Sequence, residues 1–270
     1  MRVRIGDWSR ESGIGSGRLA AAALAALLWA CGGDRSGQPA PPSTPGTGSA
    51  PAARILVVTH TEGFRHDSIP AAESGIREIG AESGAFAVDY CRTADDVRRL
   101  LTPRELAPYR AVVFANTTGS LPIADLEAFL DWIAGGRGFV GIHSASDTYH
   151  DRRAYLEVLG GEFVTHGAIV EAEVRVDAAH PAVAHLAPAF RITDEFYRFR
   201  LTGGSRTTLL SLARDPADGA PFGAGDPLAW HRSHGSGRVF YTALGHRAEL
   251  WQDARYRRHV LEGIRWAAGT

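Results

Sequence analysis

Short, continuous apolar runs alternate with amphipathic segments through the first half of the chain. A run such as Arg54–Thr59 is too short for a helix and predicts a buried strand, whereas Leu126, Phe129, Leu130 and Ile133 recur at helical spacing. The predicted strands cover residues 54–59, 86–91, 111–116 and 139–142, and the predicted helices begin after Ser68 or cover 94–101 and 123–134. This alternation predicts an α/β domain whose mostly parallel sheet carries helices on both faces.

The pattern changes beyond Leu159. Residues 169–177 alternate between apolar and polar side chains, which is typical of a half-exposed strand, and two further strands are predicted at 207–213 and 238–242. A closing helix over 253–268 places Tyr256, Val260 and Ile264 on one stripe. The second half is therefore predicted to be more antiparallel, or mixed.

The N-terminal segment has the pattern of an export signal followed by a tether. After a basic region, Leu19–Ala30 is uncharged but shorter than the roughly 20 residues of a membrane-spanning helix. Leu28–Cys31 resembles a bacterial lipobox, and Gly32 favours the outer membrane. We expect 1–31 to be a lipoprotein signal peptide with its lipobox and 32–53 a flexible linker rich in Pro, Gly and Ser. The protein would face the periplasm and touch the membrane only through a lipid on Cys31.

Residues 54–270 are expected to form one domain. The formal net charge of the chain is −1, so no broad basic surface is predicted and nucleic acid is not expected as a partner. Beyond the signal segment only Cys91 remains, so an internal disulfide is excluded, and Cys91 is expected to be a small buried hydrophobic residue at a strand end.

The segment 135–147 (GGRGFVGIHSASD) takes a buried strand directly into a turn that presents His143. In doubly wound sheets ligands bind just beyond the carboxyl ends of the strands, and the small residues Gly141, Ser144 and Ala145 allow a close approach. His143 is therefore a candidate catalytic residue. The alternative is a core histidine that is hydrogen-bonded to a backbone carbonyl.

Further histidines follow other predicted strands and are expected to share one rim of the sheet with His143 and several carboxylates. The additional members of this set are His66, His166, His246, Asp67, Asp147, Asp194 and Glu195. Asp67 has a structural alternative, because it precedes a helix that it is able to cap.

A sugar site is predicted around the sequence TDEFYRF, since carboxylates accept hydrogen bonds from hydroxyl groups and aromatic faces cover C–H surfaces. In the alternative, one of these carboxylates pairs with Arg198 or Arg200 at a strand edge. Trp230 is a candidate pocket wall or a core residue. The predicted substrate-binding residues are Arg65, Asp67, Asp194, Tyr197 and Trp230.

Neutral imidazoles and carboxylates also suit a divalent metal such as Zn, with an open coordination position. We expect His143, His166 and His246 as its ligands, although no compact ligand spacing supports the site. His231 and His234 are three residues apart, but Gly235 and Gly237 predict a turn there.

Several longer blocks resemble the ThuA, or trehalose-utilisation, family in order and spacing. They are THTEGFRHDSIP, GFVGIHSASDTYHD, LGGEFVTHG, HPAV, TDEFYRF, PLAWHRSHGSGRVFYTALGH and HVLEGIRWAAG, and they span essentially Arg54–Gly269. The resemblance implies a flavodoxin-like fold similar to the class I glutamine amidotransferases, and a role with trehalose or related disaccharides through 3-keto intermediates. In that fold a cysteine nucleophile follows this strand, but here Gly141, Ile142 and His143 occupy the place, so glutaminase activity is not expected.

Two functions remain open from the sequence. The first is an enzyme, a lyase or hydrolase that acts on a 3-keto sugar by general acid–base or metal-assisted chemistry. Its predicted catalytic residues are His143, His66, Asp147, Glu195 and His246. The second is a surface-tethered module that binds or senses a carbohydrate without changing it.

Overall fold

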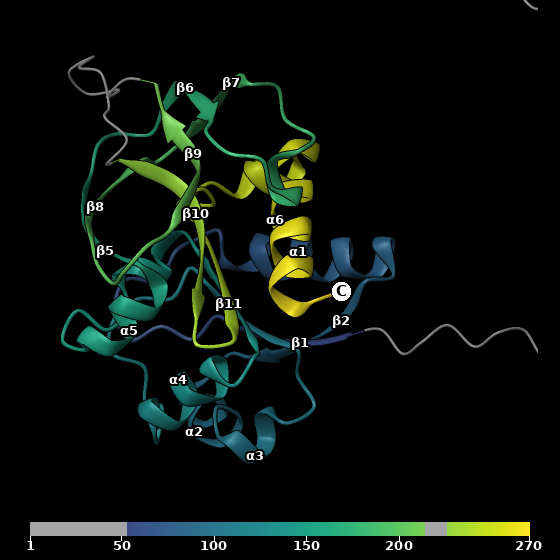
Figure 1. Ribbon diagram of the computed structural model, residues 1–270, viewed down its shortest axis with the longest axis vertical. Coiled ribbons are helices and arrows are strands. Elements are labelled where there is room, and N and C mark those ends of the chain that lie inside the picture. Colours follow the sequence, from purple (N-terminus) through teal and green to yellow (C-terminus); the bar gives the residue numbers. More distant parts are fainter. Residues whose placement is uncertain (1–52, 214–225) are drawn as a thin grey trace, which may run out of the picture. The chain divides into compact units, whose positions relative to one another are not determined.

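The computed structural model describes residues 53–213 and 226–270, which form a nine-stranded sheet flanked by helices and a separate two-stranded sheet (Figure 1). The predicted signal peptide at 1–31 and the linker at 32–53 lie outside the described residues, except for Ala53, where the first strand begins. None of the described helices is long and apolar enough to cross a membrane.

The elements follow one another as strand and helix in the first half and mainly as strands in the second. The first half contains β1 (Ala53–Val58), α1 (Ile69–Ser83), β2 (Phe86–Cys91), α2 (Ala94–Leu100), α3 (Pro103–Leu106), β3 (Ala111–Ala115), α4 (Leu126–Ala134), β4 (Gly138–Ile142), the 3-10 helix η1 (His143–Asp147) and α5 (Arg153–Leu159). The second half contains β5 (Gly161–His166), β6 (Val170–Val176), η2 (Pro181–Val183), β7 (Ala189–Asp194), β8 (Tyr197–Leu201), β9 (Thr207–Leu212), β10 (Pro227–His234), β11 (Gly237–Thr242), η3 (Ala248–Gln252) and α6 (Ala254–Ala268).

Five parallel strands form the half of the sheet that positions the site. Their order is β2-β1-β3-β4-β11, which is the flavodoxin-like order with β11 in the fifth place. Every residue of β3 and β4 is buried, because helices cover both faces and leave no polar side to these strands. The predicted mostly parallel α/β fold is confirmed.

The sheet continues from β11 through β10, β9, β6 and β7, and each of these pairings is antiparallel. β6 alternates between buried and exposed residues, as the sequence predicts for a half-exposed strand. One local prediction is wrong: His231 and His234 lie on β10 and not in a turn, because the hairpin reverses only at Gly235, whose φ is 57°.

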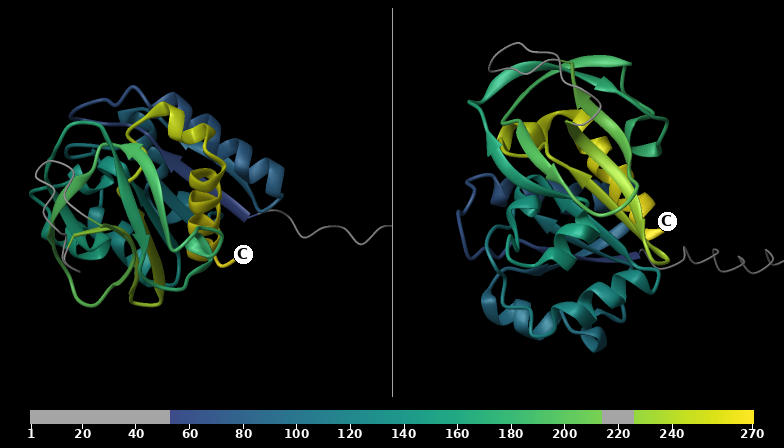
Figure 2. Two further views of the ribbon diagram at one scale, coloured as in Figure 1. Left: turned by 90° about the horizontal axis from the view of Figure 1, so that it is seen from above. Right: turned by 60° about the vertical axis from the view of Figure 1, so that its left-hand side comes forward.

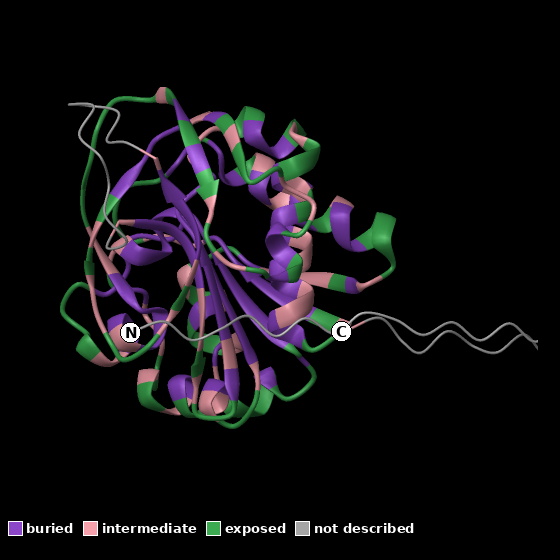
Figure 3. Ribbon diagram, turned by 45° about the horizontal axis from the view of Figure 1, so that its top comes forward, coloured by how far each residue is buried: buried purple, intermediate pink, exposed green. Residues whose placement is uncertain are grey.

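Helices cover both faces of the parallel half (Figure 2). On β11, Phe240 faces α6, where a Cβ on Gly263 would lie 2.3 Å from its ring. The next residue, Tyr241, faces the other way and lies with Leu159 of α5 against Gly141. The strands between the two helical layers form the buried centre of the domain (Figure 3).

Cys91 ends β2 and is fully buried, as predicted. Burial raises the pKa of its thiol to about 12, so it does not supply a thiolate at neutral pH.

Candidate active site at the strand ends

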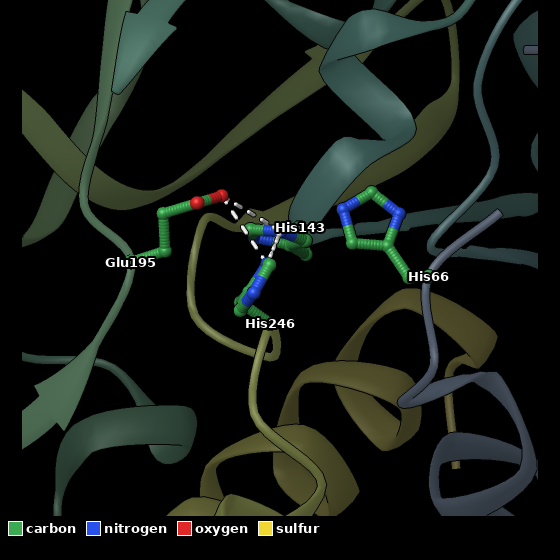
Figure 4. Close-up of side chains that lie close together, drawn as sticks. All are labelled: His66, His143, Glu195 and His246. Atoms are coloured by element: carbon green, nitrogen blue, oxygen red, sulfur yellow. Dashed lines mark hydrogen bonds and ion pairs between the residues drawn. The ribbon is translucent and has the colours of Figure 1, made fainter. Parts of the chain in front are cut away.

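Three histidines and one glutamate meet beyond the carboxyl ends of the parallel strands (Figure 4). His66 follows β1, His143 follows β4 and His246 follows β11, whereas Glu195 comes from the connection between β7 and β8. One potential ligand atom from each residue lies within 4.8 Å of those of the other three. The predicted convergence of loop histidines is therefore present for these residues.

His143 is held in an uncommon backbone conformation. Its φ is 50°, and the Tyr241 hydroxyl donates a hydrogen bond of 2.6 Å to its carbonyl oxygen. The ring is fully buried, and its Nδ1–H donates to the carbonyl oxygen of Ala243 at 2.8 Å. This bond fixes the tautomer and leaves the lone pair of Nε2 facing the cluster, where the Tyr197 hydroxyl donates to it at 2.9 Å. The buried ring bonded to a backbone carbonyl, which was the structural alternative for His143, is thus observed, and the free nitrogen of the same ring faces the cluster.

The rings of His66 and His143 meet edge to face, with centroids 4.9 Å apart. His66 Nδ1 lies 3.3 Å from the Ser144 hydroxyl. Burial lowers the pKa of His66 to about 4, and burial together with the neighbouring His66 holds the pKa of His143 well below its usual range. Both rings are therefore neutral at pH 7.

The Glu195 carboxylate lies among three histidines, His143, His166 and His246. Its Oε2 lies 3.2 Å from His246 Nδ1 and 3.7 Å from His143 Nε2, while its Oε1 lies 2.9 Å from His166 Nδ1. The hydrogen bond to Glu195 raises the pKa of His246. His166 is thus beside Glu195 and outside the four-residue cluster, so the set of residues able to hold a metal contains His66 and Glu195 in place of the predicted His166.

Buried polar groups hold the loop that carries His246. The Asp194 carboxylate accepts hydrogen bonds from the backbone N–H groups of Gly245 at 2.8 Å and Arg247 at 3.2 Å. On the other side, Asn116 Nδ2 and the Ser68 hydroxyl donate to the Gly245 carbonyl oxygen. Burial raises the pKa of Asp194 to about 6. Asp194 is fully buried, and these bonds make it a positioning residue for His246.

The other predicted residues lie away from the cluster. The Asp147 side chain, at the end of η1, points to His150, whose Nε2 lies 2.6 Å from Asp147 Oδ1. Asp147 therefore does not orient His143. Trp230 is fully buried and its Nε1–H donates to the Leu159 carbonyl, which agrees with the core alternative and not with a pocket wall. Arg65 and Asp67 are exposed on the loop after β1, and α1 begins at Ser68 without a side-chain cap, so Asp67 does not cap it.

Phe64 is the residue of this region that sequence reasoning misses. Its side chain is 67% exposed, and its ring lies edge to face against His66 with centroids 4.8 Å apart. The hydroxyl groups of Thr118 and Thr61 both donate to its carbonyl oxygen, at 2.8 and 3.2 Å. An exposed aromatic ring is thus held at a fixed place beside the cluster. The only signal in the sequence is a lone phenylalanine in a polar loop.

The fold and the cluster define a flavodoxin-like α/β domain with a histidine–glutamate site at its strand ends. The family model for trehalose utilisation, ThuA, matches residues 54–267, and the chain belongs to this family. No curated protein matches the chain significantly.

Solved structures of low sequence identity share the fold. A ThuA-like protein of Parabacteroides merdae has a TM-score of 0.68 at 22% identity, over 80% of this chain and 90% of that chain. A ThuA-like protein of Bacteroides uniformis has a TM-score of 0.66 at 22% identity, over 84% and 94%. Part of a β-galactosidase from Bacillus circulans is also similar, with a TM-score of 0.54 at 12% identity over 81% of this chain and 31% of that one. At these identities the similarity concerns the fold alone.

Proposed function

We propose that the protein is an enzyme that cleaves 3-keto derivatives of trehalose or related disaccharides by proton transfer. The observation that carries this proposal is that the pKa values of two neighbouring histidines are shifted in opposite directions. The pKa of His66 is lowered by burial, and that of His246 is raised by its hydrogen bond to Glu195. Sites in which the pKa values of neighbouring groups are shifted in opposite directions are typical of acid–base catalysis. The family's link to trehalose indicates the class of substrate.

The chemistry begins at carbon 2 of the oxidised sugar, because a ketone at carbon 3 makes the proton on carbon 2 acidic. His66, neutral at pH 7, removes this proton, and the electron pair of the C2–H bond becomes the C1–C2 double bond as the C1–O bond breaks. The departing oxygen takes the electron pair of that bond and receives the proton back from His66. The imidazole of His246, whose pKa is raised by its hydrogen bond to Glu195, stabilises the developing enolate oxygen by hydrogen bonding.

The rim of the site suits a sugar. Phe64 offers an exposed aromatic face for C–H surfaces beside the proposed base, and the side chains of His166 and His246 are partly exposed and able to hydrogen-bond to hydroxyl groups. Ordinary glycosidases use a pair of carboxylates across the scissile bond, whereas here one carboxylate, Glu195, is surrounded by imidazoles. This composition favours proton abstraction next to a carbonyl over oxocarbenium chemistry.

Product analysis by NMR tests the proposal. The purified protein is incubated with trehalose and with 3-keto-trehalose in D2O, and both cleavage and exchange of deuterium at carbon 2 are followed. We expect turnover of the keto-sugar alone, and a loss of about 100- to 10,000-fold in His66→Gln. The control His185→Gln should retain full turnover, since His185 is not part of the cluster and its Nε2–H donates to the Arg255 carbonyl of α6. Tight binding of an unchanged sugar would instead indicate the carbohydrate-binding or sensing module.

We also propose that the chain is exported and held at the periplasmic side of the outer membrane by a lipid on Cys31. The lipobox-like Leu28–Cys31 and the Pro-rich segment after it support this location.

A further inference from the structure

Three atoms of the cluster are spaced as the ligands of a metal ion. His143 Nε2 and His246 Nδ1 are 3.2 Å apart, His246 Nδ1 and Glu195 Oε2 are 3.2 Å apart, and the third distance, between His143 Nε2 and Glu195 Oε2, is 3.7 Å. A tetrahedral zinc ion with bonds of about 2.0–2.1 Å requires ligand atoms about 3.3 Å apart. The observed triangle therefore matches the ligand spacing of such an ion, which would take the lone pair of His143 Nε2 in place of the hydrogen bond from the Tyr197 hydroxyl.

Each of the three side chains is held by a bond on the side away from the triangle. The Ala243 carbonyl orients the His143 ring, and His166 holds the second oxygen of Glu195. The Asp194 carboxylate fixes the loop of His246. Metal-binding histidines and carboxylates in proteins are commonly oriented by hydrogen bonds of this kind. His246 Nδ1 and His143 Nε2 lie at hydrogen-bond distance, 3.2 Å, and the same spacing suits two ligand atoms of one cation.

We propose that His143 Nε2, His246 Nδ1 and Glu195 Oε2 bind one divalent transition-metal ion of the zinc class. Two imidazoles and one carboxylate favour such an ion over Mg²⁺ or Ca²⁺, which prefer oxygen ligands. Three protein ligands are typical of catalytic sites that leave a coordination position open, and His66 borders the triangle as the free base. The inference rests on the proposed function, for which the ion supplies the positive charge that stabilises the enolate oxygen.

Metal content and affinity test the site directly. The purified protein is stripped with a chelator, dialysed against zinc or cobalt(II), and analysed for bound metal, for affinity by calorimetry and for the visible absorption of tetrahedral cobalt. We expect one ion per chain. His246→Gln and Glu195→Gln should weaken binding more than about 100-fold, and His166→Gln about 10- to 100-fold. His66→Gln should retain one ion per chain.

His150→Gln is the matched control. His150 also lies between two carboxylates, Asp147 at 2.6 Å and Glu162 at 2.9 Å, but in a cluster outside the triangle, so its replacement should leave metal binding unchanged. Circular dichroism shows whether each variant is folded. Stoichiometric binding that is lost in folded His246→Gln and kept in His150→Gln supports the site. No stoichiometric binding to the wild-type protein, equal binding in all variants, or loss of binding in His66→Gln would overturn it.

Turnover separates this inference from the proposed function. If the stripped protein cleaves 3-keto-trehalose at the full rate, the role given to the ion in the reaction is wrong and the proposed function stands, while the metal contents and affinities above decide the site itself. If the loaded protein binds one ion but leaves the keto-sugar unchanged, the metal site stands and the proposed function is wrong.

Discussion

Acidification should unfold the protein in part through His259. This residue of α6 is 2% exposed, and its Nδ1–H donates to the Ala182 carbonyl oxygen at 2.9 Å. Among the described residues its buried Nε2 has no hydrogen-bond partner, so a proton there would have no acceptor. Burial lowers the pKa of His259 to about 4 against the opposing hydrogen bond to the Ala182 carbonyl, and His185 and His180 add to the lowering. The folded state therefore binds this proton less readily than the unfolded chain.

The sign and size of the effect follow from proton linkage. A depressed pKa in the folded state contributes no penalty above the unfolded pKa of about 6.5, and stability falls as the pH drops from there toward about 4. Between about pH 7.5 and about pH 5, His259 should lower the free energy of unfolding by about 2 kcal/mol. The full effect, reached below about pH 4, is about 3 kcal/mol.

Urea denaturation at both pH values, followed by circular dichroism, measures this loss. His259→Asn keeps a side-chain N–H donor near the place of Nδ1 but does not titrate, so its acid-induced loss should be about 2 kcal/mol smaller than that of the wild type. The control Val260→Ala is buried in the same helix turn and should cost about 2 kcal/mol at both pH values while keeping the wild-type loss. An unchanged loss in His259→Asn would refute the reasoning.

Three further predictions concern the site and the anchor. Asp194→Asn removes the charge that accepts two backbone N–H groups, so turnover and zinc affinity should both fall about 10- to 100-fold, measured by NMR and calorimetry. Phe64→Ala should raise KM for the keto-sugar about 10-fold with little change in kcat, whereas Val164→Ala, another exposed apolar residue, should change neither constant. Cys31→Ser should abolish labelling of the full chain by radioactive palmitate in a bacterial host, and labelling of this variant would exclude the lipobox.

The parallel half of the fold was predictable because its strands are buried on both faces. Continuous apolar runs predict the bounds of β1 to β4 to within about two residues. The small sheet of β5 and β8 was not predicted, since its strands are short and half-exposed, and their paired residues are separated by thirty or more residues of sequence. Ser68 illustrates a contact that local sequence patterns do not predict. It precedes α1 as expected, but its hydroxyl donates to the distant Gly245 carbonyl oxygen and does not cap the helix.

The residue types that form the site could be predicted from the sequence, but the contacts between their side chains could not. Loop histidines after parallel strands meet for a topological reason, so His66, His143 and His246 were accessible from the sequence. Both Asp147 and Glu195 were predicted as carboxylates of the site, but the sequence did not show which of them contacts His143: Asp147 is only four residues from His143, and yet η1 turns its side chain toward His150. Glu195 is fifty-two residues from His143 in sequence, but it lies beside His143 because the connection between β7 and β8 positions it there.

Glu195 explains how this flavodoxin-like domain gathers a charged cluster at its strand ends. His143 follows β4 directly, in a left-handed backbone conformation that presents its side chain at the strand end. The parallel half alone would offer buried, neutral imidazoles and no charge to bind a cation or polarise a ketone. The β7–β8 connection adds one carboxylate, Glu195, to those rings, and the last residue of β7, Asp194, holds the His246 loop. The antiparallel extension is therefore a functional part of the site, because it supplies both the negative charge of the cluster and the group that positions His246.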